Sequence, residues 1–218
     1  MKAYTSNNIR NIAVLGHGGK GKTTLCEAML YIAGASDRLG RVADGNTVLD
    51  FDSEEKRRKS SVSSAIAALE WDNTKLNIID APGLFDFEGG AAEAVRAAEA
   101  VLIVTSAGSG VDVGTEKAFR AAEKKGAAKF FAVTKTDSDH RNFYKTFDAL
   151  KEVYGNKLCP TIIPYMEGNI TKCYVNLMTG MAFSYDENGK ATKVPVPEDS
   201  VIEEMTSAFM EAVATTDD

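Results

Sequence analysis

The chain has 218 residues, 44% of them hydrophobic, which is enough to bury a core in one large domain or in a domain with a partial second one. Its formal net charge of −6 argues against broad electrostatic coating of nucleic acid, so no direct DNA binding is expected. The three cysteines lack metal-ligand spacing, and the N-terminus has no apolar signal region. No run approaches the roughly 18 apolar residues of a membrane span. These features predict a cytoplasmic protein that does not enter membranes.

A glycine-rich loop follows the first apolar segment. Residues 16–23 fit the pattern G-x-x-x-x-G-K-[ST], in which backbone N–H groups converge on phosphate oxygens. A predicted strand over 10–15 precedes the loop and a predicted helix over 24–30 follows it, which is the context that the pattern requires. We therefore expect a bound triphosphate, with Lys22 at its β- and γ-phosphates and the Thr23 hydroxyl at Mg²⁺. The expected nucleotide-binding residues here are His17, Gly18, Gly19, Lys20, Gly21, Lys22, Thr23 and Thr24.

Residues 35–61 show no sustained hydrophobic period and are predicted to form a long loop. The segment passes from an acidic stretch to the basic run 56–59. Loops of this length are usually functional or disordered. A nucleotide-sensing switch and a solvated, partly disordered excursion both fit the pattern, and the two are compatible.

A second motif follows a predicted hairpin. Residues 62–70 and 75–80 are predicted strands joined by a turn, and the second strand ends in a D-x-x-G sequence. Asp80 at the carboxyl end of this strand is expected to hold Mg²⁺ through water, and the backbone N–H of Gly83 is expected to bind the γ-phosphate.

Helices and strands alternate further along the chain, with predicted helices over 90–99 and 115–125 and predicted strands over 100–104 and 129–133. This alternation predicts an α/β protein whose sheet is covered on both faces, with ligands at the carboxyl ends of the strands. Thr134, Lys135 and Asp137 follow the last of these strands in the pattern [NT]-K-x-D. The Asp137 carboxylate can accept two hydrogen bonds from guanine, and adenine lacks that pair of donors.

These motifs together resemble the GTPase domain of elongation factor G and its divergent bacterial relatives. The resemblance implies a P-loop GTPase fold with a mostly parallel mixed sheet and helices on both faces, together with part of an inserted α+β subdomain. It places the GTP-binding core at residues 1–153 and the partial subdomain at 154–218. It also implies GTP or GDP with Mg²⁺ as cofactors and the ribosome as partner of the full-length protein. The segments that carry the resemblance are 16–24, 44–51, 78–87 and 134–137.

Departures from the family pattern bear on catalysis. Gly19 stands where the family has an acidic residue. In the first switch, Arg58-Lys59-Ser60-Ser61 replaces the family's Arg-Gly-Ile-Thr. Ser61 is therefore expected to give its oxygen to Mg²⁺, together with Thr23 and Asp80. Lys22, Ser61 and Gly83 are the expected catalytic groups. Leu84 replaces the histidine that orients the attacking water, and leucine can neither donate nor accept a hydrogen bond. Slow hydrolysis is therefore expected.

Two alternatives remain open. A binding switch would bind GTP without appreciable turnover, which Leu84 favours. Residues 17–23 also resemble the phosphate loop of deviant P-loop ATPases, although those enzymes have Lys at the position of His17. An ATP-dependent enzyme would leave the 134–137 motif unexplained. No Ser-Ala-x guanine-binding motif follows a strand after Asp137, so the chain is expected to be an N-terminal fragment of a longer protein.

Overall fold

The computed structural model describes residues 2–136, 142–155, 158–168, 170–186 and 189–215. The chain divides into two compact units, residues 1–134 and residues 135–218. The sequence placed the end of the nucleotide-binding core at residue 153, and that boundary between domains stays a prediction.

The first unit is a five-stranded sheet with the strand order β2-β3-β1-β4-β5. Neighbouring strands run parallel, except that β2 runs antiparallel to β3, as predicted for a hairpin. The strands are β1 (Ile9–Leu15), β2 (Ala65–Trp71), β3 (Thr74–Asp80), β4 (Ala100–Ser106) and β5 (Ala128–Thr134), and the helices of the unit are α1 (Lys22–Ile32), α2 (Ser53–Arg58), α3 (Glu88–Ala97) and α4 (Val113–Lys125). Short 3-10 turns cover Ser6–Asn8, Val42–Asp44 and Phe85–Phe87. The α/β class with a mostly parallel mixed sheet is therefore confirmed.

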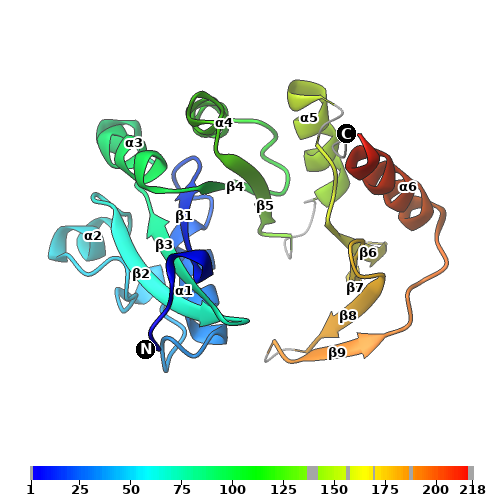
Figure 1. The fold of residues 1–218 in the computed structure, drawn as a ribbon, viewed down its shortest axis with the longest axis horizontal. Helices are drawn as coiled ribbons and strands as arrows, with labels where there is room; N and C mark the ends of the chain where they lie inside the picture. The colour runs from blue at the N-terminus through cyan, green and yellow to red at the C-terminus, as the bar shows by residue number, and fades with distance from the viewer. Residues whose placement is uncertain (1, 137–141, 156–157, 169, 187–188, 216–218) are drawn as a thin grey trace. The chain divides into compact units, whose positions relative to one another are not determined.

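Helices cover both faces of this sheet (Figure 1). One core lies under α3 and α4, where Ala94 and Ala122 pack with Val101 and Ile103 of β4. The second core lies under α1 on the opposite face and contains Leu30. Because β1, β3 and β4 each contribute side chains to both cores, these central strands read as continuous apolar runs rather than as alternating ones.

The register of the sheet brings the three motifs to one edge. Val14 of β1 lies beside Asp80 of β3, and Ser106 of β4 lies beside Thr134 of β5. The glycine-rich loop leaves the same end of β1. The carboxyl ends of parallel strands meet at one edge of a sheet, so segments more than 100 residues apart in the chain surround one location.

The segment predicted as a continuous loop, residues 35–61, contains the 3-10 turn Val42–Asp44 and the helix α2, so that part of the prediction was wrong. The Asp52 side chain caps α2, and the Glu55 side chain bonds back to the Asp52 N–H in a capping box. Glu55 is also buried and accepts from the N–H groups of Val62 and Ser63. A six-residue helix is too short to show a hydrophobic period, so its capping residues carried the only local signal.

The second unit pairs an antiparallel sheet with two helices. The sheet has the order β6-β7-β8-β9, formed by β6 (Ile162–Glu167), β7 (Ile170–Asn176), β8 (Met181–Tyr185) and β9 (Ala191–Val194), and the helices are α5 (Phe143–Tyr154) and α6 (Ser200–Ala214). Ile163, Val175 and Ile202 belong to its core. Within the described residues, no helix has the length and apolar character needed to cross a membrane.

Candidate functional site

The glycine-rich loop passes directly into α1, whose N-cap is Gly21 with φ of 88°. Among the described residues no side chain caps this helix, whereas α2 and α4 are capped by Asp52 and Asp112. The first N–H groups of a helix carry partial positive charge and bind anions readily. Gly16 has φ of 136°, and a side chain there would collide with the Val104 carbonyl oxygen of β4. The loop is thus a backbone cradle for phosphate that is fixed against the sheet.

Lys22 crosses this cradle. Its Nζ donates to the carbonyl oxygens of Gly16 and His17, at 3.0 and 3.1 Å. Burial lowers the pKa of the Lys22 ammonium, an effect that the carboxylate of Asp80 opposes. An ammonium held this way lies inside the loop, where charge-assisted bonds to phosphate oxygens are strong.

Thr23, Ser61 and Asp80 form one buried cluster, as the sequence placed them. The Thr23 hydroxyl donates to Asp80 Oδ2 at 2.6 Å and lies 3.2 Å from Ser61 Oγ. Ser61 in turn donates to Asp50 Oδ1 at 2.7 Å. All four side chains are at most 8% exposed, and they come from α1, β3 and the two ends of the segment 50–61.

The cluster is suited to a hard cation. Asp80 Oδ1 and Asp50 Oδ2 are buried and have no hydrogen-bond partner among the residues that the structure describes. Burial raises the pKa of Asp80 to about 7, and burial also raises that of Asp50. Within the described part of the chain, no three His, Cys, Asp or Glu side chains gather as a metal cluster. Mg²⁺ accepts few protein ligands and keeps phosphate and water oxygens, so two hydroxyls and two carboxylates fit it.

Gly83 lies directly over Lys22. A Cβ at Gly83 would collide with Lys22 Nζ and would lie 2.8 Å from both the Gly16 oxygen and the Gly18 nitrogen. Leu84 follows and packs on the loop, since a Cβ at Gly18 would meet Leu84 Cδ2 at 3.0 Å. The Leu84 side chain is 39% exposed. Only glycine fits position 83, and the apolar side chain of Leu84 lies next to the loop.

A partly buried ion pair joins the loop to α4. Lys20 Nζ lies 3.1 Å from Asp112 Oδ2, with the side chains 15% and 19% exposed. Through its other oxygen, Asp112 accepts from the N–H and the hydroxyl of Thr115 and so caps α4. Gly114 packs so closely on the His17 backbone that a Cβ would lie 2.6 Å from His17 Cα. The predicted loop residue Lys20 therefore also fastens the loop to a neighbouring helix.

The structure describes part of the motif that the sequence predicts to bind guanine. The Thr134 hydroxyl donates to the Lys20 carbonyl oxygen at 2.7 Å, which joins the motif to the phosphate loop. Lys135 has φ of 56° and begins the second unit. Asp137 lies outside the described residues. Thr24, a further predicted site residue, is exposed in the first turn of α1.

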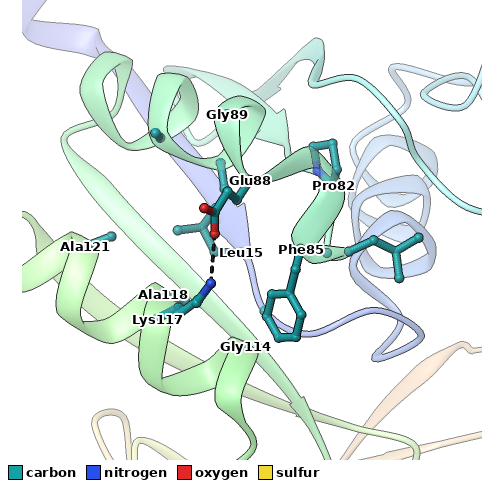
Figure 2. Close-up of a pocket in the computed structure, with 14 residues that line it drawn as sticks. Leu15, Pro82, Phe85, Glu88, Gly89, Gly114, Lys117, Ala118 and Ala121 are labelled. Atoms are coloured by element: carbon teal, nitrogen blue, oxygen red, sulfur yellow. Dashed lines mark hydrogen bonds and ion pairs between the residues drawn. The ribbon is translucent and has the colours of Figure 1, made fainter.

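An apolar cavity of about 440 Å³ lies beside the loop, between α3 and α4 (Figure 2). Leu84 and Phe85 line it, and Lys117 of α4 bonds to Glu88 of α3 at 2.8 Å across it. The Phe85 ring packs edge-on to the His17 ring. Lys117 Nζ lies 4.6 Å from the centroid of the Phe85 ring. These contacts hold the segment after Gly83 beside the phosphate loop.

Two residues at the site were missed by the sequence analysis. Asp50 was treated as part of an acidic stretch in a loop, although it is only 3% exposed. Glu27 of α1 is fully buried and accepts from two backbone N–H groups of residues 48–49. A carboxylate in the otherwise apolar helix pattern was the available signal for Glu27.

Comparison with known proteins agrees with this geometry. Residues 7–216 match the family described as "Elongation factor Tu GTP binding domain". An elongation factor G-like protein of Mycobacterium tuberculosis is 34% identical over 94% of this chain, and elongation factor G of Mycoplasma genitalium is 30% identical over 97% of it. A crystal structure of a protein from Thermus thermophilus covers 96% of this chain with a TM-score of 0.90 and 35% identity. The chain spans 28%, 31% and 32% of the lengths of these three proteins. This chain therefore belongs to the family of elongation factor Tu GTP-binding domains.

Proposed function

We propose that this chain binds GTP with Mg²⁺ as the nucleotide-binding part of an elongation factor G-like translational GTPase. The observation that carries the proposal is the buried cluster of Thr23, Ser61, Asp80 and Asp50 beside Lys22. Mg²⁺ would supply charge neutralisation between the β- and γ-phosphates. Thr23 and Ser61 would hold it directly and Asp80 through water.

The remaining residues would bind and orient the triphosphate. Backbone N–H groups of residues 17–24 and Lys22 Nζ would contact its phosphates, and the Gly83 N–H would reach the γ-phosphate. Thr134, Lys135 and Asp137 would select guanine. The relatives named as elongation factors make the ribosome the proposed partner of the whole protein and the cytoplasm its proposed location. Residues 1–153 would form the nucleotide core, and residues 154–218 would belong to an inserted subdomain.

Turnover is proposed to be slow. Phosphoryl transfer depends on an oriented water molecule, and Leu84 offers no hydrogen-bonding atom for that task. Hydrolysis to GDP would then rest on Lys22, Ser61 and Gly83. A switch that binds GTP without appreciable turnover is the second candidate, and the position of Leu84 against Gly18 favours it.

Nucleotide titration in the presence of Mg²⁺ tests the proposal. GTP should bind, and Lys22→Met should lower its affinity roughly 10- to 100-fold, because a charge-assisted bond is lost. The matched control is Lys145→Met, which removes an exposed lysine of α5 and should leave affinity unchanged. ATP binding as tight as GTP binding would refute guanine selectivity and favour the deviant phosphate-loop ATPase. Asp137→Asn should shift the preference toward xanthosine triphosphate.

A further inference from the structure

A buried carboxylate on α1 holds the segment that precedes Asp50. Glu27 is 0% exposed, and its Oε1 accepts from the N–H of Val48 at 2.8 Å and from the N–H of Leu49 at 3.1 Å. Glu27 belongs to the helix that begins at Lys22, so it joins the phosphate-loop helix to a segment more than 20 residues further along the chain.

The other oxygen of this carboxylate is enclosed by glycine. Glu27 Oε2 is buried and has no hydrogen-bond partner within the described part of the chain. A Cβ at Gly40 would collide with Oε2 and would lie 2.8 Å from Thr47 Cα. The carboxylate is thus confined between α1, Gly40 and the backbone of residues 47–49. Buried carboxylates are costly unless they are bonded, and the N–H groups of Val48 and Leu49 supply the bonds to Glu27.

The backbone that Glu27 holds leads directly to the metal cluster. Asp50 follows Leu49, and the Asp50 N–H donates to the Thr47 hydroxyl at 3.2 Å. Asp50 accepts from Ser61, which lies 3.2 Å from the Thr23 hydroxyl. Residues 47–50 are therefore fixed at both ends: by Glu27 before the cluster and by Ser61 within it.

We infer that Glu27 is a positioning residue that fixes residues 47–50 so that Asp50 and Ser61 face Thr23 and Asp80 in the geometry that binds Mg²⁺. This inference rests on the proposed function. Removing a residue that orients metal ligands without contacting the metal typically lowers metal affinity about 10- to 100-fold. The contribution of Glu27 would therefore appear in the Mg²⁺ dependence of GTP binding.

The experiment titrates Mg²⁺ at fixed GTP with the whole chain and measures the concentration for half-maximal GTP binding. Glu27→Ala should raise that concentration about 10-fold or more. Gly40→Ala acts from the opposite side of the same contact and should raise it in the same direction. Glu27→Gln keeps an acceptor oxygen for both N–H groups and should restore a value near that of the unmodified chain.

A control separates positioning from loss of stability. Val95→Ala shortens a buried side chain of α3 on the other face of the sheet and should lower the melting temperature without changing the Mg²⁺ requirement. If Glu27→Ala and Gly40→Ala lower the melting temperature but keep the Mg²⁺ requirement of the unmodified chain, the inference is wrong. If the unmodified chain binds no GTP at any Mg²⁺ concentration, the proposed function itself fails.

Discussion

The Thr23 hydroxyl donates to Asp80 Oδ2 at 2.6 Å, across 57 residues of sequence and inside a cluster that excludes solvent. The bond joins the end of the glycine-rich loop to the end of β3. It therefore ties the residue expected to contact Mg²⁺ directly to the residue expected to hold it through water.

The first prediction concerns the cost of burying Asp80. Burial raises its pKa from 3.8 to about 7. Between these two pH values, and without metal, the folded chain keeps a proton on Asp80 that the unfolded chain has released. The Asp80 contribution to stability is then present below pH 3.8 and is lost as the pH rises to about 7. Asp80→Asn removes this loss and should increase the free energy of unfolding without Mg²⁺, with an upper limit of about 4 kcal/mol.

Denaturant unfolding at several pH values measures this effect. The gain from Asp80→Asn should be small near pH 4 and should grow toward pH 7. The same variant should lose the Mg²⁺ dependence of GTP binding, because a neutral amide attracts a cation less strongly than a carboxylate does. A gain that does not change with pH would contradict the assignment of the effect to the ionisation of Asp80.

The second prediction concerns Gly83. Gly83→Ala places a methyl group against Lys22 Nζ and close to the Gly16 oxygen and the Gly18 nitrogen, so the segment must move away from the loop. We expect GTP affinity to fall by about 10-fold or more while GDP affinity changes little, since the Gly83 N–H is proposed to contact only the γ-phosphate. Gly89→Ala is the matched control because a Cβ there meets no atom of the described residues within 4 Å. Equal losses for GTP and GDP would contradict the proposed contact.

The third prediction concerns Leu84. Leu84→His introduces a side chain able to orient water and should accelerate the chemical step, with positioned acid-base groups typically contributing about 10²- to 10⁴-fold. GTP affinity should change little, because Lys22, Thr23, Asp80 and Gly83 are retained. Single-turnover hydrolysis with the intact protein, with and without ribosomes, measures the rate.

Leu84→Met is the apolar control and should remain slow. Since a histidine can depend on an activator to order the site, the acceleration is expected to be largest with ribosomes present. Rapid hydrolysis by the unmodified protein that Leu84→His does not increase would remove the case for an impaired switch.

The fourth prediction concerns the ion pair of Lys20 and Asp112. The pair fastens the phosphate loop to α4, so breaking it should loosen the loop and increase the rate of GDP dissociation. Lys20→Met and Asp112→Asn should each have this effect, and the double variant should be less than additive by about 1 kcal/mol. Stopped-flow release of a fluorescent GDP analogue from the unmodified chain and the three variants measures these rates. Strict additivity would show that the two side chains are not coupled.

The sequence by itself determined the motifs and their order. The glycine-rich loop between a strand and a helix, the acid at the end of β3 and the alternation of helices and strands are local patterns, so residue spacing and backbone propensity were enough to identify them. Parallel strands end at one edge, and Lys22, Thr23 and Asp80 could therefore be placed together before any contact was known. The antiparallel hairpin of β2 and β3 followed from its turn.

Only the tertiary structure decided which side chains are buried and what they contact. Asp50 and Glu27 resemble surface acids in the sequence, and their roles depend on burial and on partners 11 and more than 20 residues away. The helix α2 has a capping box, which is a local signal, but its Glu55 also accepts hydrogen bonds from Val62 and Ser63 of the next segment. Burial and long-range hydrogen bonds arise from packing between segments, whereas periodicity reports only on neighbours along the chain, so these features could not be predicted from spacing.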